Sequence, residues 1–189
     1  MIRLKLFLLI ITSLIFVLTG CSTKCDDFNN KIVDWMPYKT SDKIVMSRNS
    51  IRDTLIVNYS EIYHTDKVGF GAKCTCENSY ILNLSSNTLK IDIRFNDSKS
   101  IEQSEIVIND EWMNYSEQLN NLNINGKIYT DLIVYKNTNQ TSSSKFEKII
   151  VAKSIGIIKI IGKNNEWIII DDSKKQIETS DIKFKNTDC

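Results

Sequence analysis

The stretch Thr88-Leu-Lys-Ile-Asp-Ile-Arg-Phe95 alternates polar and apolar side chains without a break. Successive side chains of an extended chain point to opposite faces, so its four apolar residues share one face and its four polar residues share the other. A strand with one apolar and one polar face is typical of an antiparallel sheet that is buried on one side. This stretch therefore predicts a mainly β fold.

The same pattern recurs along most of the chain. It predicts further strands over 42–47, 51–63, 79–85, 101–109, 119–124, 127–136, 146–153, 157–161 and 167–171. Isoleucine, which favours strands, is abundant, whereas alanine, the best helix former, occurs only at Ala72 and Ala152. Short turns separate the strands, and no long helical pattern interrupts them. We therefore expect a single antiparallel meander sheet that curls into a half-barrel or open barrel.

Several connections have their own signals. Asn125-Gly126 predicts a type I′ hairpin turn, which needs positive φ at both positions. Residues 162–165 predict a second tight turn, and the polar residues 137–144 predict an exposed loop. Residues 26–35 favour one or two helical turns that end before Pro37.

The N-terminus carries a targeting pattern. Arg3 and Lys5 precede an apolar run over 6–18, which is followed by Thr19, Gly20 and Cys21. This order resembles the signal peptide and lipobox of bacterial lipoproteins. The resemblance implies a signal peptide over 1–20, helical from about 2 to 18, and lipidation of Cys21 as the first residue of the mature chain.

A transmembrane helix is the alternative for this N-terminal segment. The thirteen residues of this run rise only about 20 Å, which is short of a hydrocarbon core of about 30 Å. We therefore expect acyl chains on Cys21 to hold the protein on the membrane. The chain divides into a signal peptide over 1–20, a lipidated tether over 21–34 and an antiparallel β domain over 35–189.

Two later segments resemble small uncharacterised lipoproteins of Gram-negative bacteria. They are Trp35-Met-Pro-Tyr38, followed by 41–46, and the run 148–159 with its A-K-x-x-G-x-x-K pattern, followed by Trp167. The resemblance implies an antiparallel sheet, similar to the half-barrel of lipoprotein-carrier domains, with no established activity.

The chain departs from this family pattern at two positions. Ser41 and Ser154 stand where glycine is commoner, which argues against a strict turn requirement at either position. Gly156 keeps its glycine. We expect it to allow a bulge or a close backbone approach, as a residue of the fold and not of a functional site.

Charge narrows the range of partners. Removal of residues 1–20 takes away Arg3 and Lys5, which leaves 22 basic and 23 acidic residues and a net charge of −1. This balance argues against nucleic acid as a partner, because nucleic acid binding needs a concentrated basic face. We expect the cell envelope as the location. Ser22 favours the outer membrane, because the lipoprotein resemblance implies that inner-membrane retention prefers Asp there.

Four cysteines remain after Cys21 is lipidated, and an even number in an oxidising compartment suggests two disulfides. Cys74 and Cys76 are two positions apart, so in an extended chain their side chains share one face with poor geometry for bonding each other. We therefore favour pairing of each with Cys25 or Cys189. Three pairings are open. A Cys-x-Cys metal site and free thiols are the alternatives, and we expect no metal.

The chain offers few catalytic candidates. His64 is the only histidine and lies in a polar stretch, where solvation is a better interpretation than a dyad with a cysteine. The acidic pairs at 110–111 and 171–172 suit solvated turns better than acid–base work or calcium binding. Trp35, Trp112 and Trp167 fit a core better than a sugar- or lipid-contacting surface. We therefore expect no enzyme and no cofactor.

The leading functional hypothesis is a membrane-anchored, non-enzymatic lipoprotein with an interaction or structural role in the cell envelope. The alternative is a carrier that binds a hydrophobic ligand or lipid on the concave face of the sheet. A hydrolase of envelope polymers is a third class, which needs Asp110, Glu111 or Asp171 to meet in a cleft.

Overall fold

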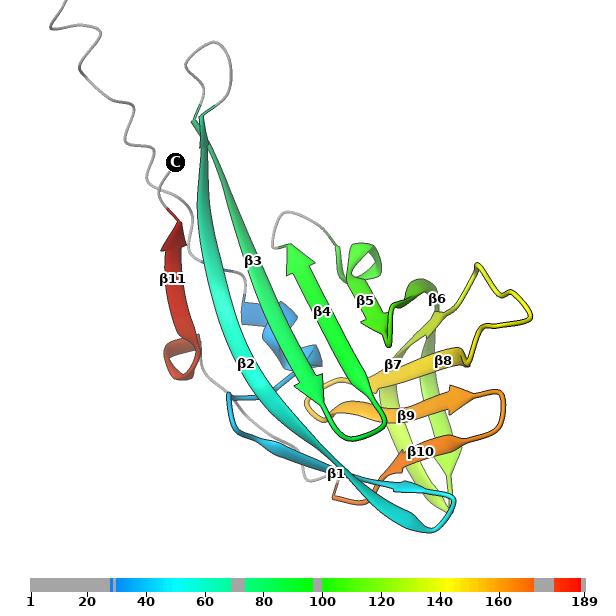
Figure 1. Cartoon of the computed structure of the whole chain (residues 1–189). Coiled ribbons are helices and arrows are strands. Elements are labelled where there is room, and N and C mark those ends of the chain that lie inside the picture. Colours follow the sequence, from blue (N-terminus) through cyan, green and yellow to red (C-terminus); the bar gives the residue numbers. More distant parts are fainter. Residues whose placement is uncertain (1–27, 29, 69–73, 97–99, 172–178, 188–189) are drawn as a thin grey trace, which may run out of the picture.

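The computed structural model describes residues 28, 30–68, 74–96, 100–171 and 179–187 (Figure 1). The predicted signal-peptide helix over 2–18 lies outside the described residues, as do Cys21, Cys25 and Cys189. The predictions that rest on them therefore remain predictions.

The described residues form one sheet of eleven strands that curves in a ring (Figure 1). All neighbouring strands are antiparallel except the last, which runs parallel to β2. The strands are β1 (Lys43–Arg48), β2 (Ile51–Val68), β3 (Cys74–Ser85), β4 (Lys90–Asn96), β5 (Glu105–Ile108), β6 (Glu111–Ile124), β7 (Lys127–Lys136), β8 (Phe146–Ala152), β9 (Gly156–Gly162), β10 (Glu166–Ile169) and β11 (Lys183–Thr187). The predicted mainly β fold and its single antiparallel meander are confirmed.

Strand β1 closes the ring. It pairs with β2 along its whole length and with β10 over Met46 to Arg48. The sheet thus curls back on itself where β1 meets β2, beside the last strand β11, which agrees with the predicted curl into a half-barrel or open barrel. Because each strand reverses direction, the turns after β1, β3, β5, β7 and β9 all lie at one end of the ring.

Three stretches differ from the predicted strands. Residues 101–103 form a short 3₁₀ helix, η2 (Ile101–Gln103), because the Ile101 carbonyl accepts bonds from Ser104 and from the Tyr135 hydroxyl, the latter at 3.0 Å. Strand β6 begins at Glu111 and not near 119, and its early residues are mostly polar and exposed, which hides the alternation. The parallel strand β11 was not predicted.

The backbone at Ser41 and Ser154 contradicts an expectation from the sequence. Ser41 and Ser154 adopt φ of 75° and 64°, the left-handed region that favours glycine. The inference that these positions lack a strict turn requirement is therefore wrong, because serine adopts the conformation there. Asn125 and Gly126 have φ of 53° and 86°, which confirms the predicted type I′ turn.

A helical turn packs into the end of the ring where the β8–β9 turn lies. This turn is η1 (Asn30–Trp35), and its Asp34 carbonyl accepts a bond of 2.6 Å from the Ser154 amide. Ile32 and Val33 are buried in the same core as the strands. The described part of the predicted tether thus belongs to the packed fold, which begins before residue 35.

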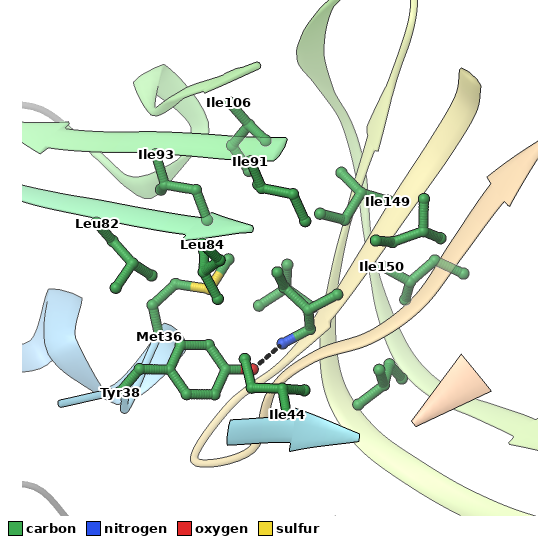
Figure 2. Close-up of a cluster of buried hydrophobic side chains, with 14 of the residues drawn as sticks. Met36, Tyr38, Ile44, Leu82, Leu84, Ile91, Ile93, Ile106, Ile149 and Ile150 are labelled. Carbon is green, nitrogen blue, oxygen red and sulfur yellow. Dashed lines mark hydrogen bonds between the residues drawn. The ribbon is translucent and has the colours of Figure 1, made fainter. Parts of the chain in front are cut away.

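The inner face of the ring is filled by its own side chains. Ile91, Ile93, Ile133 and Ile158 are each exposed by 1% or less. Figure 2 shows how side chains from β3, β4, β5 and β8 converge on Met36 and Tyr38. Close packing of this kind is what holds a sheet domain of this size together.

Candidate functional site

The end of the ring opposite η1 carries a polar pocket of about 450 Å³. Four of the five turns at that end contribute to its wall, and Arg48 joins them from the end of β1, next to the fifth turn. We call it the mouth pocket. Its lining comprises Arg48, Thr88, Asn109, Ser142, Ser143, Ser144, Lys145, Phe146, Gly162, Lys163, Asn164, Asn165 and Trp167.

Side-chain hydrogen bonds join neighbouring turns around the mouth pocket. The Asn49 amide donates to the Asn165 side-chain oxygen at 2.9 Å, which links the β1–β2 and β9–β10 turns. The Asn109 amide donates to the Thr88 carbonyl at 3.0 Å, which links the β5–β6 and β3–β4 turns. A wall that is cross-linked in this way is held in shape before any ligand arrives.

Glu111 fastens the long β7–β8 loop to the rim. Its carboxylate accepts bonds from the backbone amides of Lys145 at 2.7 Å and Phe146 at 3.2 Å, and from the Asn137 side chain at 2.8 Å. One member of the predicted acidic pair therefore has a structural role. Its neighbour Asp110 is exposed in the turn.

Asp53 lies beneath the pocket, on β2. Its Oδ2 atom accepts bonds from the Thr88 hydroxyl and from Trp167 Nε1, the latter at 3.0 Å. Burial raises the pKa of Asp53, but the bonds from Thr88, Trp167 and Ser86 and the charge of Arg48 outweigh it, so the net pKa is lowered. The carboxylate is therefore ionised at neutral pH and orients two residues of the wall.

The lining contains three cations and no acid. Arg48 is half-buried, and Lys145 and Lys163 are exposed. Lys163 Nζ donates to the carbonyls of Thr141 at 3.0 Å and Ser142 at 3.1 Å, which holds the polar loop beside the β9–β10 turn. The rest of the wall carries amides and hydroxyls, so the pocket presents donors to a ligand that is rich in oxygen or negatively charged.

The floor of the mouth pocket is aromatic. Phe146 and Trp167 are exposed by 3% and 4%, and their ring centroids lie 5.8 Å apart. Trp167 thus sits in the core, as predicted, with its indole N–H turned to Asp53. Trp35 is partly buried against the core, whereas Trp112 is 54% exposed, so the core prediction is wrong for Trp112.

The structure does not bring the other catalytic candidates from the sequence together in one site. His64 lies within strand β2 and not in a loop, and its Nδ1 is 2.6 Å from the Asn78 side-chain oxygen. In the backbone register it lies opposite Asn78, whereas Cys74 and Cys76 lie opposite Val68 and Asp66. Asp171 follows β10 at the end of the ring opposite the mouth pocket.

Metal ligation has no candidate within the described ranges, where no three His, Cys, Asp or Glu residues are grouped to hold an ion. The disulfide prediction is open: Cys74 and Cys76 belong to β3, and both predicted partners lie outside the described residues. None of the helices in the described ranges has the length and apolar character needed to cross a membrane.

The polar loop and the tight turn at 162–165 were both predicted from the sequence, but only the ring brings them together. Whether the loop and the turn lie side by side depends on the number of strands between them, and a local sequence pattern does not predict that number. Comparisons of the chain with family models, with curated proteins and with solved structures each gave no match.

Proposed function

We propose that the chain is a lipid-anchored protein of the cell envelope that binds a polar ligand at the mouth pocket without catalysing its conversion. The anchor is the lipidated Cys21 of the mature chain, on the outer membrane. The residues that follow it lead to the packed fold, which includes η1.

The convergence of four turns and the end of β1 on one pocket carries this proposal. Loops held by a rigid scaffold are where binding residues concentrate, and here the scaffold is the closed ring. Hydrogen bonds from Asn49, Asn109 and Glu111 link the turns and keep the wall in one arrangement. The excess of lysine and arginine favours a ligand with negative charge.

Amide NMR of the isotope-labelled protein, titrated with inorganic phosphate, glucuronate and glucose, tests the proposal. We expect phosphate or glucuronate to shift the signals of Lys145, Lys163 and Asn164 saturably. Glucose should do so more weakly, because it lacks the charge. Added salt should weaken the binding, since exposed cations are screened.

Matched lysine variants sharpen the test. Lys145 and Lys153 are both exposed turn residues, but Lys145 lines the mouth pocket and Lys153 lies in the β8–β9 turn at the opposite end. Lys145→Gln should weaken glucuronate binding about two- to fivefold, as expected for loss of one exposed charge interaction. Lys153→Gln should leave it unchanged. Equal effects of the two variants, or shifts confined to the opposite end, would contradict the proposal.

The alternative function, a hydrophobic-ligand carrier that uses the concave face, has less support. Ile91 and Ile133 fill that face together with their neighbours, and a carrier needs space there. Saturable uptake of an apolar dye that is blocked by bulky substitutions on the inner face would favour the carrier over the mouth pocket.

A further inference from the structure

A second hollow lies on the outer face of the ring. The β6–β7 hairpin extends beyond the end of β8, and its tip lines a groove of about 350 Å³ together with the outer side chains of β7 to β10. We call it the outer groove. Its lining comprises Glu117, Leu119, Leu122, Asn123, Ile124, Asn125, Val134, Lys148, Ile150, Lys159, Ile161, Glu166 and Ile168.

Strand register explains why this outer surface is apolar. Val134, Ile150, Lys159 and Ile168 stand opposite one another across four strands, so they share one face of the sheet. The adjacent row, which contains Tyr135, Ile149, Ile160 and Trp167, faces the interior. The first row is thus a mainly apolar stripe on the convex side of the sheet, which faces away from the interior of the ring.

The hairpin tip supplies the other wall. Leu119 and Leu122 are partly buried and pack against the core, and Ile124 is only 7% exposed. The two surfaces leave a hollow in the size range of small-molecule sites, about 300–1,000 Å³. Seven of the thirteen lining residues are apolar, so the apolar part of a ligand that lies against them removes their side chains from water.

The charged residues at the rim of the outer groove are mostly joined in ion pairs. Lys136 pairs with Glu117 at 3.0 Å, and Lys159 pairs with Glu166 at 3.0 Å. Among the described residues, no ion pair joins Lys148, which lies opposite Lys136 on one side and Ile161 on the other. The lining holds two carboxylates and two amines, and Lys136, which adjoins the lining opposite Lys148, adds a third amine, so the rim has a net positive charge.

We infer that the outer groove binds the acyl chain of a single-chain anionic amphiphile, such as a fatty acid, with the carboxylate at Lys148. The hollow suits one short chain: a methylene is close in size to a water molecule, which occupies about 30 Å³, so 350 Å³ holds roughly a dozen groups. A peptide strand fits less well, because β7, β8, β9 and β10 are each paired on both sides and leave no free backbone edge for it in the floor. This site is independent of the mouth pocket and of the anchor.

The test is calorimetric titration of the mature chain, residues 21–189 with Cys21→Ser, which lacks both the acyl chains and the apolar run over 6–18 and so needs no detergent, with dodecanoate and with dodecanol. We expect saturable binding of dodecanoate and weaker binding of dodecanol. Lys148→Gln should weaken dodecanoate binding about tenfold, to the level of dodecanol, and leave dodecanol unchanged. The exposed Lys153→Gln should change neither.

A second pair of variants, at apolar residues, tests where the acyl chain of the ligand lies. Ile161→Asn puts a polar group into the groove wall, whereas Ile128→Asn alters an exposed residue of the hairpin that lies outside the lining. We expect at least tenfold weaker dodecanoate binding for the first and no change for the second, with melting curves to confirm folding. Leu122→Asn on the opposite wall replaces Ile161→Asn if the latter fails to fold.

Three results would overturn the inference. They are absence of dodecanoate binding, equal effects of Ile161→Asn and Ile128→Asn, and a response of dodecanol to Lys148→Gln as large as that of dodecanoate. Vesicles of a two-chain anionic phospholipid form a separate arm: transfer of whole lipids to the protein, seen by native mass spectrometry, would assign the groove to membrane lipid and contradict a single-chain ligand.

Discussion

The hydroxyl oxygen of Tyr38 accepts a hydrogen bond from the backbone N–H of Ile157 at 2.7 Å, although 119 residues separate the two along the chain (Figure 2). The adjacent Gly156 has φ of 94°, and a Cβ atom there would overlap the hydroxyl and ring of Tyr38. The two segments thus meet at this point, which joins the residues after η1 to the start of β9.

Tyr38→Phe should destabilise the protein by about 1–3 kcal/mol, because it removes the acceptor and leaves the buried Ile157 N–H without a partner. Urea denaturation measures the loss. Tyr59→Phe is the matched control, since Tyr59 is 36% exposed and should change stability by less than about 0.5 kcal/mol. An equal loss in both variants would show that the Tyr38–Ile157 bond does not matter.

Gly156→Ala should cost far more than Gly126→Ala. Both glycines have positive φ, 94° and 86°, so both variants bear a backbone penalty of about 1–2 kcal/mol. Only at Gly156 would the new methyl group overlap a side chain, because nothing lies within 4 Å of a Cβ at Gly126. Denaturation midpoints of both variants separate strain from overlap, and Tyr38→Val should recover part of the loss in Gly156→Ala but none in Gly126→Ala.

Sequence patterns predicted most strands because their apolar side chains face one core. The alternation in β4 and the Asn125-Gly126 turn are local properties, and both are present in the structure. The first part of strand β6 was not predicted, because most of its residues are exposed or only partly buried and the polar–apolar alternation is lost. Strand β11 was not predicted, because it forms through a parallel pairing with β2, which is distant in the sequence.

The candidate site was less predictable than the fold. The polar loop over 137–144 and the turn over 162–165 were recognised as surface elements, but their shared pocket with Arg48 depends on closure of the ring. The role of Asp53 was not predicted, since a lone aspartate in a strand pattern carries no motif. The outer groove was missed for a related reason: Ile150 and Ile168 look like core residues, and only the register assigns them to the convex face.

Asp53 should make stability depend on pH. Its pKa is lowered on folding from an ordinary value of 3.8, so its contribution is present above that value and is lost as pH falls through the lower folded pKa. Asp53→Asn should therefore lose stability at neutral pH and show a flatter decline below pH 3.8 than the parent. Denaturation curves across this range measure it. Glu147→Gln, a carboxylate change in β8, should leave the parent's decline in place.

Cys21→Ser should give a chain that carries no acyl mass and does not start at residue 21, if Cys21 is the lipidated first residue of the mature chain. The change removes the thiol that accepts the lipid, so anchoring by acyl chains predicts acyl mass that the parent carries and the variant lacks, whereas anchoring by the apolar run over 6–18 predicts acyl mass in neither. Fractionation of cells followed by mass spectrometry distinguishes them. The parent should carry acyl mass on a chain that starts at residue 21. Adding Ser22→Cys to the Cys21→Ser variant should restore little of that mass, because the thiol is then one position out of the lipobox spacing. A parent chain that stays in the membrane fraction without acyl mass would show that the run itself is the anchor.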